Sequence, residues 1–239
     1  MNRFFTEEAV IDGTVTLSDE AVHHIKNVIK LREGESLILV KNKKELLCRI
    51  DKIEKNSIIV SIQEELESYA ENPFFVTLFQ GIPKGDKLDF IVEKAVEAGA
   101  FEIVPLKMSR CIAKIEGKDV AKKVERLGKI AKSAAQQSGR LVVPRVGEPQ
   151  SIKQVDWSQF DLKLLCYEDE DKTTLKQVLS SCECPGRIAV VIGPEGGISP
   201  QEVSDLLEAG FRAVSLGDRI LRCETAGLYT LANINYGLS

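Results

Sequence analysis

The sequence predicts an α/β protein with two domains, a small β-rich domain over residues 1–72 and a larger domain with a mostly parallel sheet over residues 73–239. Three observations predict this fold. Residues 188–192 are all apolar, which is typical of a strand that is covered on both faces. Strand-like and helix-like segments alternate in the larger domain. Short strand-like segments separated by polar turns fill most of residues 3–62.

Composition narrows the class of protein. The chain has 239 residues, of which 44% are apolar and 28% charged, as in ordinary globular proteins. No long apolar run follows the N-terminus, so we expect a cytoplasmic protein with no signal peptide and no membrane partner. Six cysteines, including a C-x-C at Cys182 and Cys184, show no four-ligand spacing. We therefore expect reduced thiols and no metal.

The N-terminal domain reads as a small barrel with one helix. Its strand-like segments are residues 13–17, 36–40, 45–50 and 57–62. After the first of these, apolar residues recur at helical spacing, namely Ala21, Val22, Ile25, Val28 and Ile29. The histidines and lysines of this segment fall largely off the apolar stripe, and a solvated helix face is their ordinary explanation.

The larger domain begins after an acidic segment, residues 64–73, that interrupts the periodicity. Residues 74–79 predict a strand, and Asp86 is placed to cap a following helix that ends near Gly99. The core face of this helix is Leu88, Ile91, Val92, Ala95 and Val96. A strand over residues 101–106 completes a strand–helix–strand unit with an expected right-handed crossover.

A basic segment follows. Residues 107–145 contain eleven lysines and arginines against three acids, whereas the whole chain has a net charge of −4. Part of this segment predicts a long helix with an apolar stripe, so the cations project mainly to its other faces. Three acids are too few to pair with all of these cations within the helix, which favours an external polyanion.

The most informative stretch follows the apolar run at residues 188–192. Gly193, Gly196 and Gly197 permit a tight loop, which we call the glycine loop (residues 193–197), and Ser199 and Glu202 predict a capping box for the next helix. Such a loop at the carboxyl end of a parallel strand is a usual ligand site. It matches neither G-x-G-x-x-G nor G-K-[ST], so no dinucleotide or nucleoside triphosphate is indicated. A purely structural turn is the alternative.

A second stretch, residues 213–226, is another strand that leaves through a glycine, followed by two arginines, an acid and a helix. Together, IGPEGG at residues 192–197 and LGDRILRCETA at residues 216–226 resemble the bacterial ribosomal RNA small subunit methyltransferase E family of the SPOUT superfamily. The resemblance covers nearly the whole chain. It implies a PUA-like β-barrel over residues 1–72 and a SPOUT α/β domain over residues 73–239, with a trefoil knot and a homodimer formed through it.

The resemblance also implies a reaction. S-adenosylmethionine would be the methyl donor, and N3 of a uridine in the 16S ribosomal RNA of the small ribosomal subunit would be the acceptor. The residues implied to enclose the cofactor are Leu165, Gly193, Glu195, Gly196, Gly197, Leu216, Gly217, Ile220 and Leu221. Methyl transfer needs an in-line approach and no metal, so positioning supplies much of the acceleration.

Uridine N3 carries a proton that must leave before methylation. Glu195 or Glu224 would act as the general base, and Arg219 or Arg222 would stabilise the developing oxyanion of the uracil ring. Each acid also has a structural alternative. Glu195 can hydrogen-bond its own loop, and Glu224 can cap the final helix.

Basic residues complete the implied site. The residues that the resemblance implies for RNA contact are Lys26, Lys30, Arg32, Lys84, Lys94, Arg110 and Arg140. Arg140 has a structural alternative as a cation at a helix C-terminus. Cys111 stands where serine is common in the family, and Cys223 where a threonine or another small residue is more usual, which puts hydroxyl hydrogen bonds at these positions in doubt.

Three other functions compete with this interpretation. The chain could be a SPOUT-type methyltransferase of another RNA, or a non-catalytic RNA-binding protein. The latter would not need two glycine-bearing loops around a crevice. A nucleotide-dependent oxidoreductase would use the crevice but would not explain the basic segment.

Overall fold

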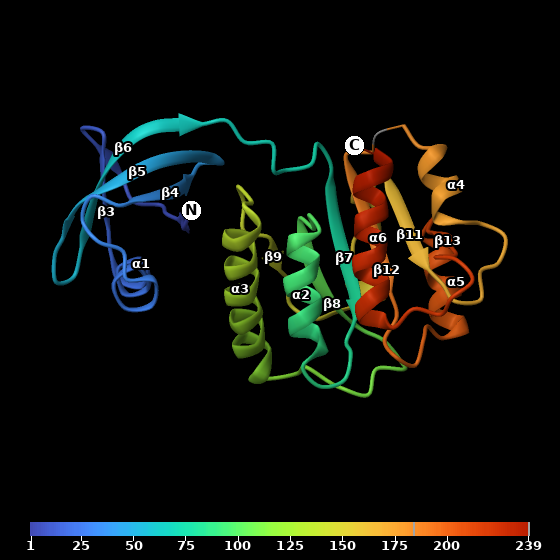
Figure 1. Ribbon diagram of the computed structural model, residues 1–239. Coiled ribbons are helices and arrows are strands. Elements are labelled where there is room, and N and C mark those ends of the chain that lie inside the picture. Colours follow the sequence, from blue (N-terminus) through green and yellow to red (C-terminus); the bar gives the residue numbers. More distant parts are fainter. Residues whose placement is uncertain (184, 239) are drawn as a thin grey trace. The chain divides into compact units, whose positions relative to one another are not determined.

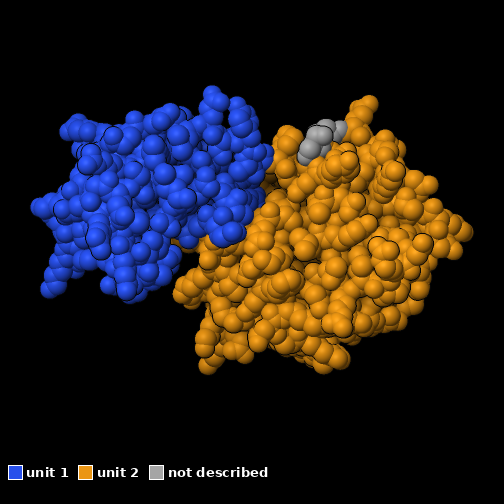
Figure 2. Space-filling model, viewed as in Figure 1, with its two compact units in different colours: residues 1–71, 135–142 blue, residues 72–134, 143–239 orange. Residues whose placement is uncertain are grey.

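The computed structural model describes residues 1–183 and 185–238, so Cys184 of the C-x-C pair lies outside the described residues. Figure 1 shows the ribbon, and Figure 2 colours its two compact units. The first unit contains residues 1–71 and 135–142, and the second contains the remaining described residues. The first unit is therefore discontinuous in sequence. None of the described helices combines the length and apolar character that a membrane span requires.

The first unit is built on a six-stranded sheet in the order β1-β4-β5-β6-β3-β2. Its strands are β1 (Arg3–Phe5), β2 (Val10–Ile11), β3 (Thr14–Leu17), β4 (Ser36–Lys41), β5 (Lys44–Ile53) and β6 (Ile58–Leu66). β1 and β4 are parallel, and the other pairs are antiparallel. The four expected strands are confirmed as β3 to β6. Among the described residues no hydrogen bonds join β2 to β1, so the sheet is not a closed barrel.

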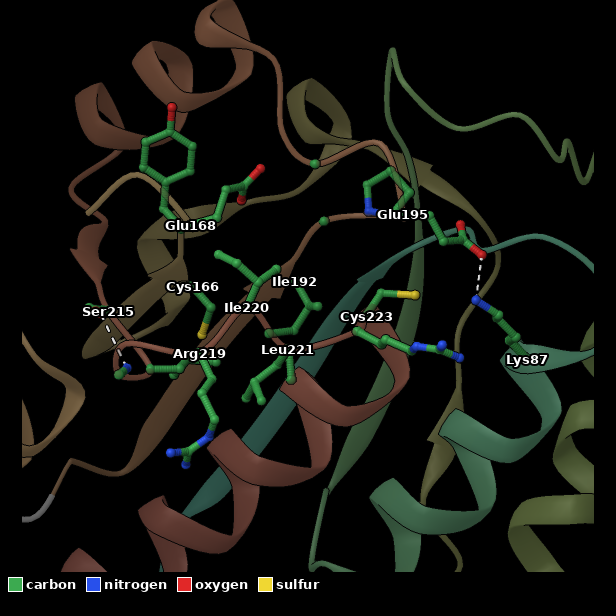
Figure 3. A pocket seen from close by; sticks show the side chains of 18 residues that line it. Lys87, Cys166, Glu168, Ile192, Glu195, Ser215, Arg219, Ile220, Leu221 and Cys223 are labelled. Atoms are coloured by element: carbon green, nitrogen blue, oxygen red, sulfur yellow. Dashed lines mark hydrogen bonds and ion pairs between the residues drawn. The ribbon is translucent and has the colours of Figure 1, made fainter. Parts of the chain in front are cut away.

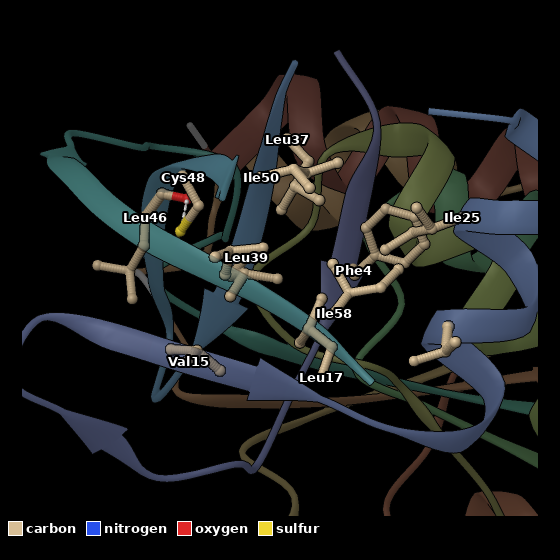
Figure 4. Close-up of a cluster of buried hydrophobic side chains, with 12 residues drawn as sticks. Phe4, Val15, Leu17, Ile25, Leu37, Leu39, Leu46, Cys48, Ile50 and Ile58 are labelled. Atoms are coloured by element: carbon tan, nitrogen blue, oxygen red, sulfur yellow. Dashed lines mark hydrogen bonds between the residues drawn. The ribbon is translucent and has the colours of Figure 1, made fainter. Parts of the chain in front are cut away.

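The core of this unit lies along one side of the sheet (Figure 4). Val15 and Leu17 alternate with exposed or half-buried neighbours on β3, as a strand with one covered face requires. Phe4 and Ile25 add apolar surface from β1 and from the helical segment, and both are almost fully buried. Removal of this surface from water is the main stabilising contribution of the unit.

The helical segment of the first unit differs from expectation. Helix α1 (Asp19–His23) passes into the π-helix η1 (His24–Ile29), which ends at Lys30 in a left-handed conformation with φ 60°. A π-turn contains more residues than an α-turn because its hydrogen bonds join residues five apart. The apolar stripe therefore does not continue as predicted, and Val28 is 62% exposed. The prediction that Val28 belongs to the core face was wrong for this reason.

The second unit has a seven-stranded sheet in the order β10-β8-β7-β12-β11-β13, with β9 paired to β8. Its strands are β7 (Phe75–Gly81), β8 (Glu102–Lys107), β9 (Arg145–Val146), β10 (Gln150–Ser151), β11 (Leu162–Cys166), β12 (Arg187–Ile192) and β13 (Arg212–Val214). Every pair is parallel, as the sequence predicts. The uninterrupted apolar run at residues 188–192 forms most of β12, and all five of these residues are buried. β12 lies between β7 and β11 in the sheet.

Helices cover this sheet (Figure 1). They are α2 (Lys87–Glu97), α3 (Asp119–Ser138), α4 (Leu175–Ser180), α5 (Pro200–Glu208) and α6 (Cys223–Leu238), with short 3₁₀ turns η2 (Ile152–Gln154) and η3 (Trp157–Gln159). The predicted core face of α2 is buried throughout. Asp86 precedes α2, but its side chain makes no capping hydrogen bond and lies 3.8 Å from the Arg126 guanidinium, so that predicted cap is corrected.

The capping box of α5 is confirmed. The Ser199 hydroxyl accepts a hydrogen bond from the Glu202 amide, and the Glu202 carboxylate accepts one from the Ser199 amide at 3.0 Å. With Pro200 at the first helical turn, these contacts fix where the helix begins. The capping box thereby also fixes the direction in which the chain leaves the glycine loop.

Candidate active site

A cavity of about 390 Å³ lies at the edge of the sheet where β11, β12 and β13 end (Figure 3). Because these strands are parallel, their carboxyl ends meet there, with Cys166 in register with both Ile192 and Val214. The predicted site residues that line the cavity are Gly193, Glu195, Gly197, Leu216, Gly217, Arg219, Ile220, Leu221 and Arg222. Its size is that of a small-molecule pocket.

Three predicted site residues do not line the cavity. Leu165 is fully buried in the core beside β12. Gly196 packs against Arg110. Glu224 lies beside the cavity, where its carboxylate contacts Lys87, which does line the cavity. The structure therefore brings most, but not all, of the predicted residues together around one space.

The glycine loop is held firmly from β7. The side-chain amide of Gln80 donates hydrogen bonds to the backbone carbonyl oxygens of Gly81 at 3.1 Å and Gly193 at 3.4 Å. A Cβ added at Gly81 would lie 2.6 Å from the ring and backbone nitrogen of Pro194, so the two backbones approach as only glycine permits. Within the loop, the Gly197 amide donates to the Pro194 carbonyl oxygen at 2.9 Å.

Arg110 holds the loop from another side. Its guanidinium Nη1 donates to the carbonyl oxygen of Gly196 at 3.0 Å. The adjacent Ser109 donates through its amide and hydroxyl to the Glu202 carboxylate at 2.7 and 3.0 Å. Burial raises the pKa of Glu202, but hydrogen bonds from Ser199 and Ser109 outweigh it, so the net pKa is below the usual value. Arg110, predicted to contact RNA, is in this structure a contact of the glycine loop.

The opposite side of the cavity is formed by residues 215–222, which we call the exposed loop. Backbone hydrogen bonds join Ser215 to Thr173 and Leu175 at one end, and Arg222 to Thr225 and Ala226 at the other. Between these ends, the Gly217 amide donates to the Ser215 hydroxyl at 3.2 Å, and the side chain of Ile220 is 80% exposed. The exposed loop is therefore fixed at its ends rather than along its length.

Lys87, the first residue of α2, joins two acids beside the cavity. Its Nζ lies 3.0 Å from Glu195 Oε1 and 3.3 Å from Glu224 Oε2. Figure 3 shows Lys87 directed toward Glu195. Glu195 also accepts from the Lys84 amide at 3.1 and 3.3 Å. Lys87 was not predicted as a site residue, although its position at the start of the helix that follows β7 was a signal for it.

These contacts determine the charge of the Lys87 cluster (Lys87, Glu195 and Glu224). Burial raises the pKa of each carboxyl group, but hydrogen bonds from backbone amides and Lys87 outweigh it, and both pKa values fall below the usual value. Hydrogen bonding to Glu195 raises the pKa of Lys87. All three groups are therefore ionised near neutral pH, and the cluster carries one net negative charge.

Two thiols line the cavity as neutral groups. Burial raises the pKa of Cys166 to about 12, and Cys166 Sγ lies 3.4 Å from the Thr230 hydroxyl. Burial and the neighbouring Glu224 raise the pKa of Cys223 to about 12, and its Sγ donates to Glu224 at 3.2 Å. Since a thiolate is the nucleophilic form, neither cysteine is placed for covalent catalysis.

Arg140 requires a correction. Its side chain is only 4% exposed, and its guanidinium binds both oxygens of Glu71 at 3.2 and 2.6 Å. The same carboxylate accepts from the amides of Leu141 at 2.9 Å and Val142 at 3.3 Å. The planar fork of arginine matches a carboxylate, which explains this structural role. The Arg140 side chain is therefore buried and paired within the protein, and we no longer assign it to RNA contact.

The other predicted RNA contacts are dispersed. Lys30, Arg32 and Lys84 have exposed side chains. Lys26 Nζ donates to the carbonyl oxygens of Glu54 at 2.9 Å and Lys55 at 3.1 Å. Lys94 pairs with Glu93 and Glu97 on its own helix, each at 2.8 Å. Part of the hydrogen-bonding capacity of Lys26 and Lys94 is therefore used within the protein.

Some cations of the basic segment have partners on another helix. Asp89 of α2 lies 3.2 Å from Lys123 Nζ and 2.6 Å from the Arg126 guanidinium. Glu125 pairs with Lys129 one turn along α3 at 2.7 Å. An acid of α2 therefore pairs with two cations of the basic segment, so the unpaired positive charge around α3 is smaller than the count within the segment predicts.

Comparisons with known proteins give a consistent result. The model of the RNA methyltransferase domain family matches residues 70–235, and that of the RNA methyltransferase PUA domain matches residues 17–63. The chain is 36% identical to the ribosomal RNA small subunit methyltransferase E of Bacillus subtilis, over 99% of this chain and 96% of the relative. It is 32% identical to the protein of the same name from Synechocystis, over 95% of this chain and 75% of that relative.

A solved structure extends the comparison to the fold. The ribosomal RNA small subunit methyltransferase E of Neisseria gonorrhoeae, bound to S-adenosyl methionine, aligns with a TM-score of 0.86 and 35% identity, over 98% of this chain and 97% of that one. The agreement spans both units of the chain. This protein belongs to the ribosomal RNA small subunit methyltransferase E family.

Proposed function

We propose that this protein is an S-adenosylmethionine-dependent methyltransferase that methylates N3 of a specific uridine in 16S ribosomal RNA. The observation that carries the proposal is the cavity between the glycine loop and the exposed loop, with two carboxylates and two arginines at or beside it. Family membership and the S-adenosyl methionine bound to the Neisseria gonorrhoeae relative support it.

The residues present fit the proposed cofactor. Apolar side chains, including Ile192, Leu216 and Leu221, offer surface for an adenosine, and Gly217 has open space where a Cβ would stand. The carboxylates of Glu168 and Glu195 also line the cavity and favour a cationic ligand. When bound there, S-adenosylmethionine supplies a methyl group activated by its sulfonium charge.

The chain's own residues have four tasks in the proposed reaction. The two loops bind and orient the donor, and α6 closes the cavity with Cys223 and Ala226, which limits the entry of water. Glu195 or Glu224 accepts the N3 proton, while Arg219 or Arg222 stabilises the charge that develops on the uracil oxygens. Both acids are ionised and therefore able to accept a proton.

We extend the proposal to the organisation of the chain. Residues 1–72 would bind RNA as a PUA-like domain, and residues 73–239 would bind the cofactor, catalyse transfer and form a homodimer through a trefoil knot. Lys26, Lys30, Arg32, Lys84, Lys94 and Arg110 remain proposed RNA contacts. The assembled small subunit would be the substrate, and the cytoplasm would be the site of action.

Methyl transfer from labelled S-adenosylmethionine to small subunits that lack endogenous modification tests the function. We expect labelled 3-methyluridine in nucleoside digests of the 16S RNA. Naked 16S RNA is the parallel substrate, and it should be labelled less if the assembled subunit is recognised. Label in another nucleoside, or in none with either substrate, would overturn the proposed reaction.

A further inference from the structure

We propose that Lys87 and Glu195 together recognise the imide edge of uracil, with Lys87 donating to a ring carbonyl oxygen while Glu195 accepts the N3 proton. Glu224 is a positioning residue that holds Lys87 in place. This inference rests on the proposed function and assigns two side chains to the specificity of that site.

The first support is the position of the pair. Lys87 and Glu195 both line the cavity, although they come from α2 and from the glycine loop. Their Nζ and Oε1 atoms are 3.0 Å apart, so a cationic donor and an anionic acceptor stand side by side. Hydrogen bonds from the Lys84 amide to both Glu195 oxygens orient the carboxylate.

The second support is hydrogen-bonding capacity. A lysine ammonium has three N–H donors, and the contacts of Lys87 with Glu195 and Glu224 use two of them. One donor therefore remains for a ligand. Glu195 Oε1 already accepts from the Lys84 amide and from Lys87, which occupies both of its lone pairs, whereas Oε2 accepts only the longer contact from Lys84. Oε2 is therefore the oxygen with a lone pair left for the N3 proton.

The third support separates the two acids. Glu224 contacts Lys87 at 3.3 Å but does not line the cavity, whereas Glu195 does. Cys223 also donates to Glu224 on the same oxygen that faces Lys87. Glu195 is therefore the acid that can touch a base in the cavity, and Glu224 acts through Lys87.

The pair is complementary to uracil and not to cytosine. Uracil presents carbonyl oxygens on both sides of N3–H, which match an ammonium donor and a carboxylate acceptor. Cytosine has an unprotonated N3, so the Glu195 acceptor would face another acceptor. Where uracil has its C4 carbonyl, cytosine has an amino group, so a Lys87 donor directed to that side would face another donor. A polar site discriminates strongly when the wrong ligand leaves its groups unpaired.

The chemical step balances. The N3 proton moves to a Glu195 oxygen, and the electrons of the N–H bond stay on the ring as negative charge shared with the carbonyl oxygens. The Lys87 ammonium stabilises that charge. The N3 lone pair forms the bond to the methyl carbon as the carbon–sulfur bond breaks, leaving its electron pair on sulfur. Glu195 then releases the proton to water.

The test compares single-turnover rates of full-length variants on small subunits. We expect Lys87→Met to lose at least about 100-fold, in the range for removal of one donor to a developing oxyanion. Lys87→Arg, which keeps the charge, should retain more activity. Lys176→Met, at an exposed position of α4 outside the cavity, is the matched control and should equal the wild type. Calorimetry should show a loss of S-adenosylhomocysteine affinity in Lys87→Met that is much smaller than the loss of rate, because Lys87 also contacts the glycine loop through Glu195.

Rescue by substrate distinguishes catalysis from a structural role. RNA that contains 5-fluorouridine has a more acidic N3, so it depends less on stabilisation of the anion. Subunits assembled with this RNA should accelerate Lys87→Met by a larger factor than the wild type. Equal acceleration of both would contradict the inference.

A double-mutant cycle tests the role of Glu224. Glu195→Gln should reduce the rate by about 10² to 10⁴, as for loss of a general base. Glu224→Gln should lose less, and adding it to Lys87→Met should cause little further loss, because Glu224 acts through Lys87. A full additional loss in the double variant would overturn the positioning role.

The outcomes separate the inference from the proposed function. If the wild type forms no 3-methyluridine, the proposed function fails. If the wild type forms it and a folded Lys87→Met matches its rate, the inference alone fails. Thermal unfolding reports whether the variant is folded. If Lys87→Met does not fold, Lys87→Gln takes its place in the same comparison. Glutamine removes the charge and is one bond shorter but keeps a neutral amide donor, so a smaller loss of rate is expected.

Discussion

The two loops around the cavity are attached to the protein in different ways. Side chains from three separate segments hold the glycine loop, namely Gln80, Arg110 and Lys87. The exposed loop is attached by backbone hydrogen bonds near its ends, and Ile220 at its centre faces solvent. The difference indicates that one side of the site is formed before a ligand arrives, while the other side adjusts to the ligand.

The strongest test of this difference is Gly81→Ala. A Cβ there would lie 2.6 Å from Pro194 and 2.9 Å from the Gly193 carbonyl carbon, and neither is the end of a flexible side chain, so we expect the free energy of unfolding to fall by about 3 kcal/mol. Urea unfolding measures it. Gly128→Ala is the matched control, because nothing lies within 4 Å of its Cβ and helix α3 should gain about 0.5–1 kcal/mol. A neutral Gly81→Ala would show that the glycine loop is not rigidly seated.

Arg110→Ala should have a smaller effect. It removes one hydrogen bond to the Gly196 carbonyl oxygen, so we expect about 1 kcal/mol less stability and weaker binding of S-adenosylhomocysteine by calorimetry. Arg145→Ala, which removes a cation from the same basic segment, should leave that affinity unchanged. If Arg110→Ala binds S-adenosylhomocysteine normally but loses activity on RNA, the arginine serves the substrate rather than the loop.

Ile220→Ser should change stability by less than about 0.5 kcal/mol, because the side chain is already 80% exposed. If the exposed loop packs on the ligand, the affinity for S-adenosylhomocysteine should nevertheless fall about tenfold, since part of an isoleucine is then buried. Ile112→Ser, at a similarly exposed isoleucine outside the cavity, should change neither quantity. Unchanged affinity in Ile220→Ser would mean that the exposed loop does not adjust.

The smallest effect is a dependence on pH. The pKa of Glu195 is lowered in the folded protein, so its contribution to stability is present above the unfolded pKa of about 4.3 and is lost as the pH falls through the folded pKa. Between pH 7 and about pH 3.5, the wild type should therefore lose more stability than Glu195→Gln. Urea unfolding at both pH values checks this, and equal losses would show that the carboxylate does not fasten the loop.

Local sequence patterns predicted much of the larger unit. The apolar run of β12, the core face of α2 and the capping box at Ser199 each depend on neighbouring residues, and each is confirmed. The prediction for Val28 failed because a π-turn altered the helical periodicity. The prediction for Asp86 failed because its backbone (φ −94°, ψ 10°) is not in the extended conformation that an N-cap residue usually adopts. Residue type and spacing do not indicate such local backbone conformations.

The candidate site was predictable where glycines mark tight loops, and less so where its residues are ordinary charges. Lys87 resembles any exposed lysine in sequence, and its role depends on acids more than a hundred positions away. Arg140 resembles a basic RNA contact until Glu71 is seen beside it. Charge and spacing do not indicate which distant partner a long side chain meets.

The contacts of Glu71 have a consequence for synthesis of the chain on the ribosome. This carboxylate accepts from Arg140, Leu141 and Val142, which belong to the same compact unit although they are made much later. At roughly 5–20 residues per second, these partners are added about 4–14 s after Glu71. The N-terminal unit therefore cannot complete its fold as soon as it emerges, and a nascent chain ending before residue 140 leaves this carboxylate without its arginine.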